Sequence, residues 1–175
     1  MRRRWHTLFP WMLALWLAGI AAAHGGEPRT ALVLDFDLID EQADVTPFPE
    51  APSRLTMVKA RISRGLEAAG IYRIADPAPI AAELERAQAM YTTLLDCKGC
   101  ELDLARQLGV ERIVVGWVQR VSNLILNLNI EVRDAATGAT LLNKSADMRG
   151  NNDRSWQRAA DFLIRDMAER GQRDL

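Results

Sequence analysis

The chain has 175 residues, 49% of them hydrophobic, which is enough apolar side chain for a folded domain rather than a disordered chain. Its 22 basic and 23 acidic residues nearly balance and form no basic block, so nucleic acid is excluded as an expected partner. With only two cysteines and two histidines, few sites are available for metal or histidine-based catalysis.

The first 23 residues have the pattern of a cleavable export signal. Arg2, Arg3 and Arg4 form a positive region, an apolar run extends from Trp11 to Ile20, and Ala21-Ala22-Ala23 is a small-residue cleavage site. The apolar run is shorter than the ~20 residues of a membrane-spanning helix. We therefore expect a periplasmic mature chain that begins at His24 and does not span the membrane.

The mature chain would hold 175 less 23 residues, which is the size of one domain. Loss of the three arginines lowers the basic count from 22 to 19 against 23 acidic residues, a formal charge of −4. No cysteine stands directly after the apolar run, where a lipid would be attached, so we expect no lipid anchor. We divide the chain into a signal peptide (1–23), a flexible mature N-terminus (24–29) and a single α/β domain (30–175).

The first half of the mature chain alternates strands and helices. Thr30 to Leu38 is typical of a strand, with Leu32, Leu34, Phe36 and Leu38 on one face. A helix follows from an N-cap at Ser53 to Gly70; its apolar face holds Leu55, Val58, Ile62, Leu66 and Ala69, and its solvated side holds Arg54, Arg61 and Arg64. The pattern then predicts a short strand over Ile71 to Ala75, a helix over Ile80 to Leu94 and a helical turn or two over Leu102 to Leu108.

The second half is mostly sheet. Arg112 to Val118 is apolar enough for a buried strand, and Leu124 to Arg133 alternates apolar with polar residues, which predicts one dry and one polar face. Asp134 to Gly138 has hairpin chemistry, and Ala139 to Ala146 returns as the partner strand. A closing helix is predicted from Asp153 to Glu169. The fold class is α/β (α+β), with the order βαβαβββα, a mixed sheet and helices mainly on one face.

Four segments carry a resemblance to known families: ALVLDFDLID, GLEAAGIYRIAD, ARQLGVERIVVGWV and LNIEVRDAATGATLL. Together they resemble the amino-terminal domain of TolB and the related domain of CsgG-type envelope assembly proteins. The paired cysteines and the RGNNDRSW segment are similar to a family of small exported bacterial proteins described as a domain of unknown function. The resemblance implies an envelope accessory or assembly domain and supplies no catalytic residues. The chain lacks the propeller repeats of TolB.

Cys97 and Cys100 are the strongest chemical signal. An even cysteine count in an exported chain predicts an internal disulfide. A Cys-x-x-Cys pair is also typical of thiol redox proteins, and this alternative stays open, although no proline follows Pro79 to supply a thioredoxin-like cis-proline. Haem attachment would require histidine where Glu101 stands. A closed zinc site would need further nitrogen or sulfur ligands, so we predict no metal and no cofactor.

Two other residue groups point to specific chemistry. His24 would carry both an α-amino group and an imidazole, as in a copper brace, but no second mature histidine completes such a site. Asp35 and Asp37 resemble the nucleophile motif of haloacid-dehalogenase-type phosphatases, yet the chain lacks the later acidic pair. No Ser-His-Asp set can form either, because the body of the chain has no histidine.

The remaining cluster precedes the last helix. We predict partner binding by Arg149, Asn151, Asn152, Asp153, Arg154 and Trp156, with a turn and helix cap as the structural alternative. The polar sheet face with Asn127, Asn129 and Glu131 is either solvated or a docking surface. The sequence thus predicts a periplasmic, non-catalytic domain that binds or assembles with another envelope protein. The alternatives are a thiol-disulfide redox protein and a soluble carrier of a small ligand or metal.

Overall fold

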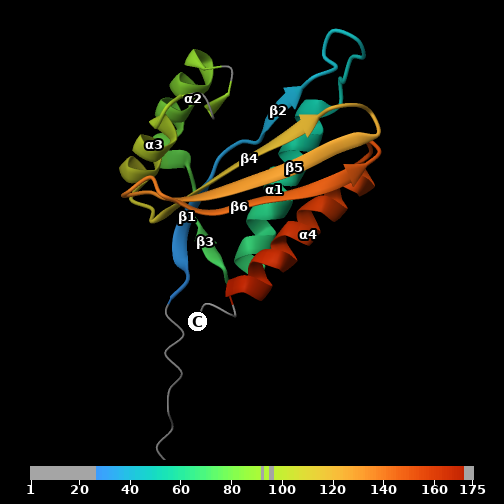
Figure 1. Cartoon of the computed structure of the whole chain (residues 1–175). Helices are drawn as coiled ribbons and strands as arrows, with labels where there is room; N and C mark the ends of the chain where they lie inside the picture. Colours follow the sequence, from blue (N-terminus) through green and yellow to red (C-terminus); the bar gives the residue numbers. More distant parts are fainter. Residues whose placement is uncertain (1–26, 92, 95–96, 172–175) are drawn as a thin grey trace, which may run out of the picture.

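Six strands form one mixed sheet in the computed structural model, which describes residues 27–91, 93–94 and 97–171 (Figure 1). The strands are β1 (Arg29–Val33), β2 (Asp37–Asp40), β3 (Tyr72–Ile74), β4 (Arg112–Arg120), β5 (Ile125–Asp134) and β6 (Thr140–Arg149). The helices are α1 (Ala51–Ala68), a 3-10 turn η1 (Ala78–Ile80), α2 (Ala81–Met90), α3 (Cys100–Leu108) and α4 (Asp153–Gly171). The sheet order is β3-β1-β4-β5-β6, with β2 paired to β4 beyond the end of β1.

Parallel and antiparallel pairing divide this sheet in two. β1 pairs in parallel with β3 and β4, whereas β4, β5 and β6 form an antiparallel meander. β6 is a ten-residue edge strand, and β3 at the other edge has three residues. The mixed α+β fold predicted from the sequence is confirmed.

The helices pack on both faces of the sheet but unequally. The larger core lies under α1 and α4, which cover the same face of the sheet (Figure 1). The even-numbered apolar residues of β5 pack there with Trp156 and Leu163. A smaller core lies on the opposite face under η1, α2 and α3, and holds Leu32, Leu34 and Ile113. The two longest helices therefore share one face, and the short helices cover only one end of the other.

The predicted strand over Thr30 to Leu38 is wrong in one respect: the chain forms two strands there. Val33 aligns with Val114 and Asp37 with Trp117, so four steps along the first chain match three along β4. This extra residue is a bulge, and a one-residue shift moves side chains to the other face. Leu34 accordingly packs under α2 and α3, whereas Phe36 packs under α1.

α1 begins earlier than predicted and makes more contacts. Its N-cap position is Glu50, with Pro52 in the first turn, and the Ser53 hydroxyl donates to the Glu50 carbonyl at 2.9 Å instead of capping the helix. Val58, Ile62 and Leu66 are buried as predicted. Of the arginines assigned to the solvated side, only Arg64 is exposed, because α4 packs alongside and engages Arg54 and Arg61.

The loop between β2 and α1 is held by a buried arginine. The Arg120 side chain is fully buried, and its Nε lies 3.0 Å from Asp40 Oδ1. The guanidinium of Arg120 also stacks 5.2 Å from the Phe48 ring, and Arg54 lies 5.3 Å from the same ring centroid. Phe48 also packs edge-to-face against Trp156 of α4, with the ring centroids 5.8 Å apart, and thereby links the loop to both helices of the larger core.

None of the helices within the described residues is long and apolar enough to cross a membrane.

Candidate functional site

The segment from Arg149 to Trp156 connects β6 to α4 and divides into anchored and free residues. Trp156 is fully buried, and its Nε1 donates to Asn151 Oδ1 at 3.0 Å. The same oxygen accepts from Arg54 Nη1 at 2.9 Å, and Arg54 Nε pairs with Asp153 at 2.7 Å. Asn151, Asp153 and Trp156 therefore hold the start of α4 against α1.

Asn152 has the role of a helix cap. Its side-chain oxygen accepts from the Ser155 N–H at 3.0 Å, which is the N3 donor of α4. Arg149 and Arg154 are exposed, and no ion pair or side-chain hydrogen bond engages their guanidinium groups within the described chain. Of the six residues predicted for partner binding, these two arginines are exposed and have guanidinium groups without such a contact, whereas Asn152 and Asp153 are exposed but already hydrogen-bonded.

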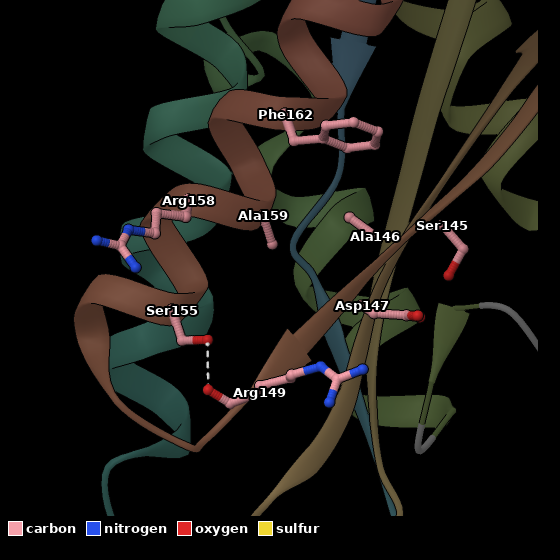
Figure 2. A pocket seen from close by; sticks show the side chains of 8 residues that line it. All are labelled: Ser145, Ala146, Asp147, Arg149, Ser155, Arg158, Ala159 and Phe162. Carbon is pink, nitrogen blue, oxygen red and sulfur yellow. Dashed lines mark hydrogen bonds between the residues drawn. The ribbon is translucent and has the colours of Figure 1, made fainter.

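An open groove of about 570 Å³ lies between α4 and the edge of β6 (Figure 2). Ala146, Ala159 and Phe162 give it apolar walls, and the Phe162 side chain is 49% exposed. Figure 2 shows Phe162 and Ala159 directed from α4 toward the strand. The other lining residues are polar or charged: Ser145, Asp147, Arg149, Ser155 and Arg158.

The groove was missed at the level of sequence, although Arg149 belongs to it. The exposed stripe of α4 joins Arg154, Arg158 and Phe162 at four-residue spacing, which places one aromatic ring in line with two arginines. This spacing is the signal that sequence reasoning could have used. The stripe lies beside the free edge of β6 because of the way α4 packs on the sheet. Residue spacing alone does not predict that packing.

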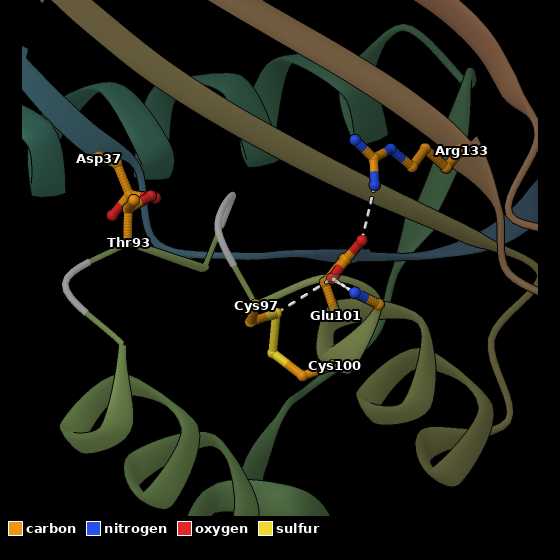
Figure 3. The surroundings of a disulfide bond; sticks show 7 residues. Asp37, Thr93, Cys97, Cys100, Glu101 and Arg133 are labelled. Carbon is orange, nitrogen blue, oxygen red and sulfur yellow. Dashed lines mark hydrogen bonds and ion pairs between the residues drawn. A yellow bond between two sulfur atoms is a disulfide. The ribbon is translucent and has the colours of Figure 1, made fainter.

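Cys97 and Cys100 form a disulfide bond immediately before and at the start of α3 (Figure 3). Cys97 is buried and Cys100 is half-buried. Lys98 and Gly99 between them have positive φ angles of 52° and 115°, so the four-residue segment is a tight turn into the helix.

A buried carboxylate lies against this disulfide. Glu101 is 3% exposed, and its Oε2 accepts from the Gly99 N–H at 3.1 Å and lies 3.1 Å from Cys97 Sγ. The second distance is a contact and not a hydrogen bond, because a disulfide sulfur carries no proton. Glu101 Oε1 pairs with Arg133 at 2.6 Å (Figure 3). Arg133 also pairs with Glu131 on β5. The disulfide segment is thus tied to the polar face of the sheet, through a charged residue that sequence reasoning did not single out.

Cys97, Cys100 and Glu101 are also the group in the described chain whose potential metal-ligand atoms lie within 4.8 Å of one another. Zinc binds cysteine as the thiolate, and neither sulfur can be a thiolate while the two are bonded to each other. Metal binding here would first require reduction of the disulfide.

Asp35 and Asp37 line a polar pocket of about 200 Å³ beyond the end of β1. Asp35 pairs with Lys59 at 2.6 Å and accepts from Gln88 at 2.6 Å. Burial favours the neutral acid, but the hydrogen bond and charge of Lys59, together with Gln88, outweigh it and hold the pKa of Asp35 below its ordinary 3.8. An ionised carboxylate held by a lysine is the arrangement of a structural ion pair.

The polar sheet face is only partly covered. Asn127 donates to Asp147, and Glu131 accepts from Thr140 at 2.8 Å and Asn143 at 3.3 Å. Asn129 is half-buried and donates to the Asn127 carbonyl at 3.4 Å. These side chains mainly bond one another across β5 and β6.

The predicted signal peptide, its cleavage site and His24 lie outside the described residues.

A family model described as "Protein of unknown function (DUF2380)" matches residues 29–167. No curated protein matches the chain significantly. Lipoprotein GNA1162 from Neisseria meningitidis is similar in structure, with a TM-score of 0.53, 17% identity, and coverage of 81% of this chain and 97% of that one. A PelC dodecamer from Paraburkholderia phytofirmans gives a TM-score of 0.50, 14% identity, and coverage of 81% and 90%. TolB from Acinetobacter baumannii gives 0.47 at 8% identity, with 83% of this chain and 29% of that one covered.

At these identities the structural likenesses show the fold alone. The family match confirms the resemblance to a family of unknown function that the sequence indicated.

Proposed function

Because the chain belongs to this family of unknown function, its role has to be argued from the molecule, and we propose that it is an exported, non-catalytic domain that binds or assembles with another protein of the bacterial cell envelope. The observation that carries the proposal is the open groove between β6 and α4, whose lining includes Arg149 and Arg158. Exposed Arg154 lies one helical turn before Arg158 on α4. Arginine and aromatic residues are among those that concentrate binding energy in protein interfaces.

Export is supported by the basic, apolar and Ala-Ala-Ala segments of residues 1–23. A disulfide is suited to an oxidising compartment outside the cytoplasm. The fold is similar to that of Lipoprotein GNA1162 and to that of PelC, which is described as a dodecamer. These likenesses support a role in envelope assembly.

The non-catalytic part of the proposal is supported by the chemistry of the side chains. No histidine follows His24 in the sequence, so the usual general base is missing from the folded domain. The two carboxylates of the small pocket are engaged, Asp35 by Lys59 and Gln88 and Asp37 by Thr93. A groove that displays unpaired arginines suits recognition better than proton transfer.

The test combines localisation with partner capture. The intact mass of protein from the periplasmic fraction should correspond to a chain starting at His24; retention of Met1 there would exclude signal cleavage. Crosslinking in intact cells should then join the wild-type protein to an envelope protein, and Arg149→Ala/Arg154→Ala should weaken that product. Arg64→Ala, an exposed arginine on α1, is the matched control. Equal crosslinking by all three proteins would give the arginines no role in partner binding.

A second candidate, a thiol-disulfide redox protein, is favoured by one observation. Cys100 is half-buried at the first position of α3, the location typical of reactive Cys-x-x-Cys pairs, and buried Cys97 lies beside the Glu101 carboxylate. In such a reaction two electrons and two protons from a partner dithiol would open the Cys97–Cys100 bond and leave the partner as a disulfide. Thiol titration of protein taken from cells separates the candidates: a redox protein gives a mixed population, and a structural disulfide gives no free thiol without denaturant and reductant.

A further inference from the structure

We propose that the groove between β6 and α4 binds an extended, acidic peptide segment of a partner protein, which pairs with the free edge of β6 as an additional strand. The inference deepens the proposed function, on which it rests, by naming the mode of binding and the chemistry of the partner.

The first support is the orientation of the β6 backbone. Gly150 N–H donates to the Leu124 carbonyl at 3.2 Å, which directs the even-numbered residues of β6 toward β5. In antiparallel pairs the direction alternates, so the N–H and C=O groups of Ser145, Asp147 and Arg149 point away from the sheet. The Arg149 carbonyl accepts from the Ser155 hydroxyl at 3.3 Å, so Ser145 and Asp147 are the accessible part of the edge that lines the groove.

The second support is that this edge is not blocked. Edge strands are commonly protected by lysine, proline or a covering element. The lysine of β6, Lys144, instead turns toward α4 and pairs with Asp166 at 2.9 Å. No proline lies in β6, and within the described chain it pairs with β5 alone. Ser145, Asp147 and Arg149 are all exposed.

The third support is the apolar wall opposite the edge. A strand added beside β6 would place alternate side chains over Ala146, Ala159 and Phe162, while the intervening side chains would face solvent. Strand addition of this kind takes affinity from main-chain hydrogen bonds and specificity from pockets for alternate side chains.

The charge of the residues around the groove favours an acidic peptide. The guanidinium groups of Arg149, Arg154 and Arg158 have no partner within the described chain, whereas the nearby carboxylates are already engaged, Asp147 by Asn127, Asp153 by Arg54 and Asp161 by Arg61. A peptide with acidic side chains beside β6 could pair with Arg149 and would be attracted by the positive charges of Arg154 and Arg158 on α4, whereas a basic peptide would be repelled. An acidic strand is therefore the favoured occupant.

The probe for the experiment is a blocked decapeptide that alternates glutamate and valine, titrated into the purified mature protein at low salt. We expect saturable binding, with amide chemical-shift changes and slowed hydrogen exchange at Ser145 and Asp147. A lysine-valine peptide of the same pattern controls for charge. A glutamate-valine peptide that is N-methylated at alternate residues controls for backbone pairing, because methylation removes its donors.

Two variants test the edge and the charge separately. Ser145→Pro removes an outward N–H without removing a donor to β5, and should abolish peptide binding. Arg149→Gln/Arg158→Gln should weaken it by about fivefold, since each exposed charge pair contributes modestly. Arg64→Gln on α1 is the matched control and should bind as the wild type does. Melting curves of all variants establish that the fold is retained; if Ser145→Pro fails to fold, the N-methylated peptide alone decides the backbone step.

The outcomes separate this inference from the proposed function. Equal binding of the N-methylated peptide, binding mapped to the Asn127–Asn129 face, or no saturation at millimolar peptide would overturn strand addition. A dimer of the protein that protects the same amides before peptide is added would assign the edge to a second copy instead. If Ser145→Pro crosslinks to an envelope protein as well as the wild type does, the proposed function is retained. Strand addition at β6 is then the wrong mode of binding.

Discussion

The ring of Phe36 lies 2.4 Å from the position that a Cβ atom would occupy on Gly116. Phe36 sits in the bulge between β1 and β2, and Gly116 is the residue of β4 over which the ring packs. The φ angle of Gly116 is not positive, so glycine is needed there for space and not for backbone conformation.

Gly116→Ala should therefore destabilise the protein by about 1–3 kcal/mol, the usual cost of adding a methyl group to a packed core. The free energy of unfolding from urea titration measures the effect. Phe36→Leu makes room for the new methyl group, so the double substitution should cost less than the sum of the two single ones. Strict additivity would mean that the ring does not restrict position 116.

The cap of α4 can be separated from its exposed arginine. Asn152→Ala should cost about 1 kcal/mol because it removes the acceptor for the Ser155 N–H, whereas Arg154→Ala should change stability by less than ~0.5 kcal/mol. Asn152→Asp retains an acceptor and should restore most of the loss. Urea midpoints of the three variants give the comparison; equal midpoints for Asn152→Ala and the wild type would contradict the cap.

The disulfide closes a short segment, so its contribution to stability should be modest. Cys97→Ala/Cys100→Ala should fold and lose roughly 2 kcal/mol, the chain-entropy value for so small a loop. The double variant should melt at the temperature of the reduced wild type and should not respond to added reductant. Unchanged melting together with a lost reductase activity would favour the redox candidate.

Acid should weaken the contact between α1 and α4. The hydrogen bond from Arg61 is the main cause that holds the pKa of Asp161 below its ordinary 3.8. A depressed folded-state pKa stabilises the protein above the unfolded value, and this contribution is lost as pH falls through the folded value. Between about pH 4 and pH 2 the free energy of unfolding should fall less steeply in Asp161→Asn than in the wild type. Glu85→Gln, an exposed carboxylate on α2, is the control; parallel curves for Asp161→Asn and the wild type would remove this pair from the acid response.

Periodic patterns in the sequence predicted much of the fold. Val58, Ile62 and Leu66 are buried along α1 as their spacing indicates, and Leu126, Leu128 and Ile130 face the larger core from β5. Leu124, predicted for the same apolar face, is 73% exposed because β5 begins only at Ile125. Periodicity determines which face of an element is apolar, and it is less informative about where the element starts.

The missed features depend on tertiary contacts. The bulge after Val33 is invisible in an unbroken apolar run, because alternation looks the same whether or not the register shifts. Glu101 is buried only because Arg133 of β5 reaches it. Asn151 and Trp156, both predicted for partner binding, are hydrogen-bonded to each other, and Asn151 also accepts from Arg54, which is 97 positions away in the chain.

β2 lies at the carboxyl end of β1, and this position limits where the protein can bind a small ligand. In open sheets whose first strand lies between two parallel neighbours, small ligands settle beyond the carboxyl ends of the strands, where the connections diverge to opposite faces. Here β2 continues past β1 along β4 and occupies part of that space (Figure 1). A polar pocket of about 200 Å³, lined by Asp35 and Asp37, lies at this end of the sheet. The chain's own β2 therefore lies where such sheets bind small ligands. This placement agrees with the proposal that a partner binds at the flank, in the groove between β6 and α4.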